Sequence, residues 1–112
     1  MAIFGPQYYQ QQIHNAFKKL YQRMSSKEDF QFTAADQKVF MLHIAGILDE
    51  CKLQASELSL DEPIDMDGIS LSIPQMLKEH KLLPIEEALM ELKSKYHFKM
   101  TNPVKTSIKT RK

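Results

Sequence analysis

The chain contains 112 residues, of which 43% are hydrophobic and 26% are charged. This length and composition are typical of one globular domain and exclude disorder along the whole chain. The single cysteine, Cys51, excludes an internal disulfide bond and fits a reducing compartment.

Neither a secretory signal nor a membrane span is expected. In a signal peptide positive charge precedes the apolar run, whereas the first charged residue of this chain is Lys18. The longest strongly apolar run without charge, residues 39–48, is about half as long as a membrane-spanning helix requires. We therefore expect a cytoplasmic protein with no membrane insertion.

The formal net charge is only +1, but the charges are segregated along the chain. Residues 1–27 carry four bases and no acid, residues 28–91 carry all 14 acids and four bases, and residues 92–112 carry seven bases and no acid. Blocks of one sign are typical of interaction segments or of solubilising ends. The basic ends and the acidic middle are therefore the first places to look for a function.

The first predicted helix covers residues 7–24. Apolar residues recur there at spacings of three and four, which places them on one helical face with polar residues on the other. The residues of this apolar face are Ile13, Ala16, Phe17, Leu20, Tyr21 and Met24.

A second and longer helix is predicted over residues 33–58. Thr33 is a suitable N-cap residue, and Asp36 stands in the first turn, where the helix dipole favours a negative charge. Residues 39–48 within this helix are apolar nearly all round, which is typical of a helix with neighbours on several sides. We therefore expect this helix to form the centre of the fold.

The segment that follows contains turn residues and a short alternating pattern. Pro63 and the pair Asp67-Gly68 interrupt any helix, and apolar residues alternate with serines after Gly68. For residues 64–71 we favour a loop with an extended arm over the alternative of a short β-hairpin, which would be marginally stable by itself.

Two shorter helices are predicted next. Ser72 and Gln75 form a capping-box pattern that begins a third helix over residues 72–80. Pro84 is tolerated in the first turn of a fourth helix, predicted over residues 84–98.

The predicted fold is all-α: a small bundle of about four helices, with a short β-hairpin near residues 64–71 as the open alternative. Residues 1–100 are expected to form a single helical domain. Residues 101–112 are polar and basic, and we expect them to form a flexible C-terminal tail.

No pattern points to a metal centre. His43 lies in the most apolar run. A second metal ligand on the same helix would stand three or four residues away, and those positions hold Val39, Phe40, Gly46 and Ile47, which cannot bind a metal through their side chains. We interpret His43 as a hydrogen-bonded histidine in or at the edge of the core.

The acidic segment does not fit a calcium loop either. With Gly68 at the sixth position of an EF-hand, Pro63 and Pro74 occupy the first and twelfth positions, where carboxylates are required. The three glycines are too scattered for a phosphate-binding loop, and Cys51 is expected to point inward as an inert thiol. We therefore expect a non-enzymatic protein without catalytic residues, metal or cofactor.

Our main functional hypothesis is a protein–protein interaction or adaptor module within a larger assembly. The acidic segment would meet the partner together with partly exposed methionines, since methionine suits adaptable contact surfaces. The candidate protein-binding residues are Glu57, Asp61, Glu62, Asp65, Asp67, Met76 and Met90. The partner's identity is open, and a second copy of the chain is one option.

The alternative hypothesis is a nucleic-acid-binding accessory protein. It requires the bases of the first helix and of the C-terminal segment to form one surface that contacts phosphates. Direct reading of DNA by the fourth helix is disfavoured, because Glu86 and Glu87 at its N-terminal end would repel the duplex. The candidate residues are Lys18, Lys19, Arg23, Lys93, Lys95, Lys99, Lys105, Lys109, Arg111 and Lys112.

Overall fold

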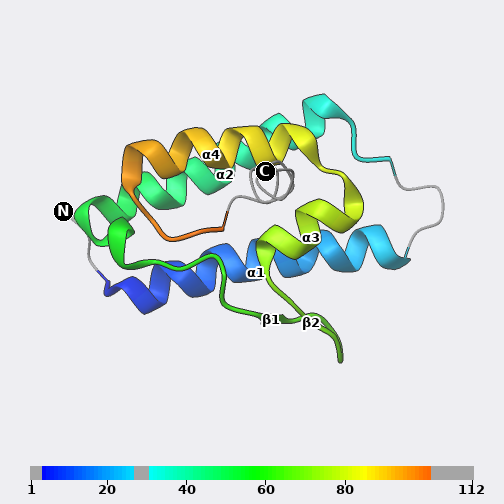
Figure 1. Ribbon diagram of the computed structural model, residues 1–112, viewed down its shortest axis with the longest axis horizontal. Coiled ribbons are helices and arrows are strands. Elements are labelled where there is room, and N and C mark those ends of the chain that lie inside the picture. Colours follow the sequence, from blue (N-terminus) through cyan, green and yellow to red (C-terminus); the bar gives the residue numbers. More distant parts are fainter. Residues whose placement is uncertain (1–3, 27–30, 102–112) are drawn as a thin grey trace, which may run out of the picture.

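The computed structural model describes residues 4–26 and 31–101, which form four α-helices and a small β-hairpin (Figure 1). The elements in chain order are α1 (Pro6–Ser26), α2 (Ala34–Cys51), the 3-10 helix η1 (Lys52–Glu57), β1 (Ile64–Asp65), β2 (Ser70–Leu71), α3 (Ile73–His80) and α4 (Leu83–Tyr96). The prediction of a small all-α bundle with a short hairpin is confirmed. Of the predicted basic tail, residues 102–112 lie outside the described residues.

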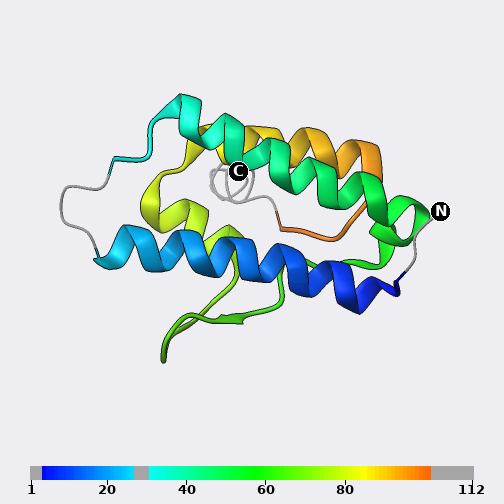
Figure 2. The ribbon, with the colours of Figure 1, turned by 180° about the vertical axis from the view of Figure 1, so that it is seen from behind.

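Helix α2 packs against both α1 and α4 (Figures 1 and 2). It is antiparallel to α1, so the Tyr9 hydroxyl near the start of α1 donates a hydrogen bond to Glu50 near the end of α2, at 3.4 Å. It is parallel to α4, and the Tyr96 hydroxyl at the end of α4 donates to Asp49 at 3.3 Å. The start of α1 and the ends of α2 and α4 therefore meet at one end of the molecule.

The core lies where one face of each long helix meets the others. Ile13 and Phe17 on α1, Ile44 and Leu48 on α2 and Leu89 on α4 are fully buried. On each helix these residues follow the spacing of three and four that predicted the apolar face. Burial of apolar area of this kind is the main source of folding free energy.

Two of the helix starts are fixed by the predicted side-chain caps. The Thr33 hydroxyl accepts a hydrogen bond from the Asp36 amide at 3.1 Å, and the Ser72 hydroxyl accepts one from the Gln75 amide at 3.3 Å. The Asp36 carboxylate and the Gln75 carboxamide accept in return from the cap amides, which completes a capping box at both helices.

The second helix is shorter than predicted. Lys52 adopts a φ of 60°, which ends the α-helix at Cys51, and the chain continues as η1 rather than as α-helix. Leu53, which follows directly, is 93% exposed. The predicted single α-helix over residues 33–58 is thus wrong from residue 52 onwards, because this break depends on backbone conformation rather than on apolar spacing.

The fourth helix ends at Tyr96, two residues before the predicted boundary, because His97 takes a left-handed conformation with a φ of 67°. The chain then becomes extended and pairs with the segment after η1. The Leu60 amide donates to the Lys99 carbonyl at 2.8 Å, and the Lys99 amide donates to the Leu58 carbonyl at 2.9 Å. This pairing brings Phe98 into the core, where it is buried.

Residues 64–71 form the short β-hairpin that was the alternative, rather than the favoured loop with an extended arm. Ile64 pairs with Leu71, and both side chains face the core, whereas the tip is exposed. The turn uses Gly68 at a φ of 95°, a conformation that residues with a Cβ rarely adopt, and the Gly68 amide donates to the Asp65 carboxylate at 3.1 Å.

Candidate docking surface

Two carboxylates of the acidic segment bind glutamines of α1. The Gln10 carboxamide donates to Glu62 at 2.8 Å, and the Gln22 carboxamide donates to Asp67 at 3.0 Å. The Gln10 side-chain oxygen also accepts the Ser59 amide at 2.8 Å. These bonds join residues more than 40 positions apart and fasten the segment along α1.

The other acids of the segment have different surroundings. Asp61 accepts from the Thr101 amide at 2.8 Å and from the Thr101 hydroxyl at 3.1 Å. Asp65 accepts the amide at the hairpin turn, and Glu57 is exposed. Although these side chains are exposed, four of the five predicted docking acids hold their own chain in place.

We predict that replacement of Gln10 by alanine lowers the free energy of unfolding by about 1–2 kcal/mol, because two hydrogen bonds are lost and the half-buried Ser59 amide is left without a partner. Gln11→Ala is the matched control, since the exposed Gln11 side chain bonds only Asn15 of the same helix. Urea unfolding of both variants measures the difference. Equal losses in the two variants would contradict this role of Gln10.

His14 faces the same segment one helical turn after Gln10. Its ring is half-buried, and Nε2 is buried without a hydrogen-bond partner among the described residues. Burial lowers the pKa of His14, and the nearby Glu62 carboxylate and the Ser59 backbone oppose this shift only in part. The folded protein therefore favours the neutral ring.

This lowered pKa predicts a stability that depends on pH. The unfolded chain binds a proton near the ordinary histidine pKa of 6.5, whereas the folded chain binds it only at lower pH. Stability from this group is therefore fully present above about pH 6.5 and falls as the pH drops towards the folded pKa. His14→Gln, which keeps a neutral side chain, should lose less stability than wild type between pH 7.5 and 5 in urea unfolding. Parallel curves for the two proteins would exclude His14 as the cause.

The two candidate methionines do not form a surface pair. Met76 is fully buried, at 0% exposure, so the prediction that its side chain is partly exposed is wrong. It lies on the core-facing side of α3 with Ile73 and Leu77. This side could not be recognised from the spacing of apolar residues, because α3 has too few turns. Met90 is half-buried and packs against the core. Cys51 is buried as predicted, and burial raises the pKa of its thiol.

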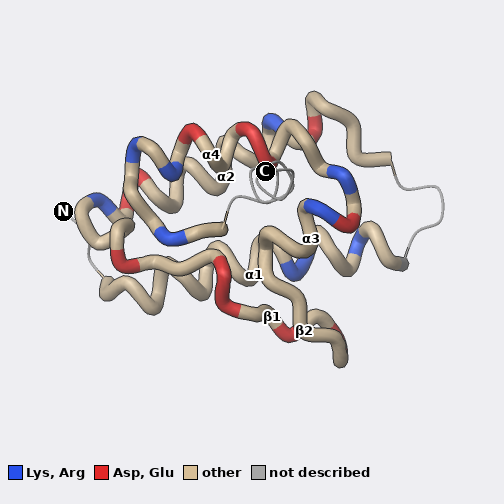
Figure 3. The backbone as a smooth tube through the Cα atoms, in the orientation of Figure 1, with Lys and Arg blue, Asp and Glu red and all other residues tan. Residues whose placement is uncertain are grey.

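The candidate bases among the described residues fall into two groups, one on α1 and one at the end of α4 and directly after it (Figure 3). Lys18, Lys19 and Arg23 lie in the second half of α1; at 1.5 Å per residue, Arg23 is about 21 Å along the helix from Tyr9. The end of α4, by contrast, lies near Tyr9 at the start of α1. This follows because Tyr96 of α4 and Tyr9 of α1 bind the neighbouring residues Asp49 and Glu50 at the end of α2.

Lys93 and Lys95 therefore lie towards the start of α1, away from the half of that helix that carries Lys18, Lys19 and Arg23, so the fold does not bring these two groups of bases together. Lys93 donates to the Met100 carbonyl, and the Lys95 ammonium lies 5.3 Å from the ring centre of Tyr96. The candidates Lys105, Lys109, Arg111 and Lys112 lie outside the described residues.

Helix α2 is not covered on all sides, in contrast to the prediction. Val39 is 66% exposed and Leu42 is 74% exposed, and Gly46 is exposed as well. His43, predicted to lie in or at the edge of the core, is also exposed. The part of the bundle that the structure describes covers the side of α2 that faces α1 and α4, and it provides no element for the outer side.

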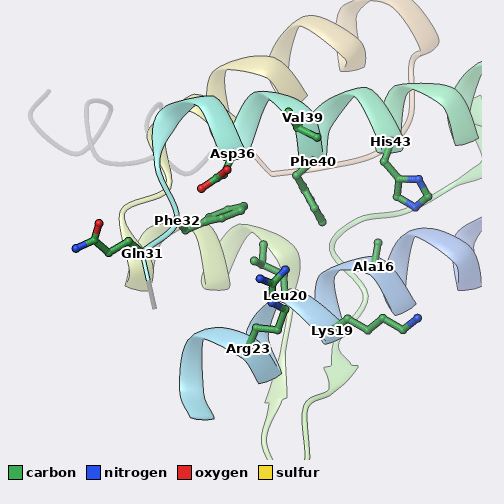
Figure 4. A pocket seen from close by; sticks show the side chains of 10 residues that line it. All are labelled: Ala16, Lys19, Leu20, Arg23, Gln31, Phe32, Asp36, Val39, Phe40 and His43. Carbon is green, nitrogen blue, oxygen red and sulfur yellow. The ribbon is translucent and has the colours of Figure 1, made fainter. Parts of the chain in front are cut away.

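An open groove of about 490 Å³ lies between the second half of α1 and the first half of α2 (Figure 4). Phe32, Phe40 and Leu20 form its apolar floor, with the Phe32 and Phe40 ring centres 6.3 Å apart. Val39 stands on the rim, so the groove is continuous with the exposed side of α2. The polar lining consists of Lys19, Arg23, Gln31, Asp36 and His43.

Other kinds of site lack support in the part of the chain that the structure describes. No three side chains of histidine, cysteine, aspartate or glutamate are grouped there so that they could hold a metal ion. None of the helices is long and apolar enough to cross a membrane. Comparisons with models of protein families, with curated proteins and with solved structures found no match.

Gly46 has no evident role within the monomer. It lies inside α2 on the exposed side, and a Cβ built on it would contact nothing. We therefore predict that Gly46→Ala raises the free energy of unfolding by about 1 kcal/mol, because glycine is the poorer helix former. Chemical denaturation measures the gain. A destabilised variant would mean that Gly46 is required for folding.

Proposed function

We propose that this protein is a protein–protein interaction module that binds a helical segment of its partner in the groove between α1 and α2. The observation that carries this proposal is the exposure of Val39 on the rim of an open groove whose floor contains the rings of Phe32 and Phe40. Contiguous exposed apolar surface with a polar rim is typical of binding sites, and a groove between two helices suits an amphipathic helix.

The charges around the groove favour a partner that carries carboxylates. Lys19 and Arg23 line its α1 side, and Lys18 lies beside Lys19 on the same helix. Asp36 is the one acid among the described lining residues, and its carboxylate already belongs to the capping box of α2. A helix with apolar side chains towards Phe40 and acidic side chains towards α1 would therefore match both the shape and the potential of the groove.

This location differs from the one that the sequence suggested. The acidic segment has a structural use in its bonds to α1 and to Thr101, and this makes it the weaker candidate for a docking site. The separation of the basic groups also weakens the nucleic-acid alternative among the described residues. Binding without catalysis therefore remains the proposal that the geometry supports best.

A charge reversal tests the groove. Lys19→Glu should weaken binding of the partner by at least tenfold, because one favourable contact becomes repulsive, while the exposed position leaves folding unchanged. Lys95→Glu at the far end of the molecule is the matched control and should bind as wild type does. A partner recovered from the native cells with wild-type protein is titrated against each purified variant by calorimetry.

The binding site itself is located by NMR. Chemical-shift changes on addition of the recovered partner should concentrate on the groove residues of α1 and α2. Binding that is equally strong for Lys19→Glu, with shifts centred on residues 57–67, would overturn the proposal and return the site to the acidic segment. Binding only to nucleic acid would overturn it as well.

A further inference from the structure

A second surface of α2, which adjoins the groove at Val39, is formed by Ala35, Val39, Leu42 and Gly46, and we call it the outer stripe. All four residues are exposed. Their spacing of four, three and four positions is that of a seam between two packed helices. At 100° per residue they point away from the buried Ile44, and Val39 alone is shared with the groove.

The outer stripe combines a large exposed side chain with a position that carries no side chain. Leu42 is 74% exposed, and Gly46 follows it by one helical turn. Because the space above Gly46 is open, the backbone there is directly accessible to another molecule. A leucine from a facing helix would fill this space, which gives a use to a glycine that the monomer does not need.

The charges beside the stripe are arranged in a complementary way. Lys38 and Asp49 are both exposed and lie 11 residues apart, which is three helical turns. They are therefore on the same flank of the stripe, with Lys38 towards its start and Asp49 beyond its end. Along the helix the order is therefore Lys38, Leu42, Gly46 and Asp49, with the two charges on one flank of the stripe.

We propose that the outer stripe binds the outer stripe of a second copy of this chain in an antiparallel pair with two-fold symmetry. In such a pair the same flank of both helices meets, with the direction reversed. Leu42 of each copy then lies over Gly46 of the other, and Lys38 of each copy lies opposite Asp49 of the other. One register satisfies both contacts to within one residue, and it is this match of charge and shape that selects a second copy as the occupant.

The pairing is expected to be weak. The stripe covers about 17 Å of one helix. A single helix face of that length buries less area than the roughly 800 Å² per partner of a standard interface. Contacts below that size are typical of transient association. The pairing does not rest on the proposed function. The two surfaces share Val39, but Phe32 of the groove lies before α2, Phe40 lies on another side of α2, and Lys19 lies on α1.

Sedimentation equilibrium of the full chain tests this pairing, with protein concentrations from about 10 µM to about 1 mM, the range in which a contact of this size should form. The average mass should rise from that of one chain towards that of two. Leu42→Glu and Gly46→Leu should both remain monomeric throughout. Leucine is a better helix former than glycine, so loss of pairing in Gly46→Leu would not arise from unfolding. Ile69→Glu, at the exposed hairpin tip, is the control that should pair normally.

A charge exchange then tests the register. Lys38→Asp and Asp49→Lys should each shift the midpoint of association at least threefold to higher concentration, and the double variant should restore it. Circular dichroism checks that loss of the hydrogen bond between Tyr96 and Asp49 leaves the helices intact. A wild-type chain that stays monomeric would overturn the pairing and leave the groove untouched. Association that ignores Leu42→Glu, or a double variant weaker than both single ones, would overturn the proposed register.

Discussion

The packing of one face of α2 against both α1 and α4 is the constraint on which the rest of the molecule depends. Ile44 and Leu48 on this face are fully buried. Because α4 runs parallel to α2, the chain must return along the length of the molecule between them, and parallel neighbours always need such a connection. Residues 52–82 make the return, and they contain η1, the hairpin and α3 (Figure 1).

The same arrangement gives the charge blocks their meaning. The acidic middle of the sequence coincides in part with the returning segment, where Glu62, Asp67 and Asp61 bind Gln10, Gln22 and Thr101. The basic groups in the second half of α1 and at the end of α4 are held apart, because α1 and α4 run in opposite directions along α2. Among the described residues, segregation of charge along the sequence therefore does not become one basic surface facing one acidic surface.

Local signals were sufficient to predict the helices, because caps and apolar spacing act within a few residues. Thr33 and Ser72 begin their helices as predicted. The site was not predictable in the same way. The bond between Gln10 and Glu62 joins residues 52 positions apart, and the burial of Met76 depends on elements that surround α3. A helix that is apolar all round also gives no indication of which side remains open, which is why the exposure of His43 and Leu42 was missed.

The all-round apolar character of α2 has an explanation if its sides have separate uses. The face with Ile44 and Leu48 holds the core, the side with Phe40 forms the floor of the groove, and the side with Leu42 is left to the solvent in the monomer. A helix that served the core alone would need an apolar stripe on about a third of its circumference. The two proposed contacts would add the remaining sides, so every turn of residues 39–48 would be under selection for folding and for binding at once. Substitutions there would then separate into those that unfold the domain and those that only disconnect it from its partners.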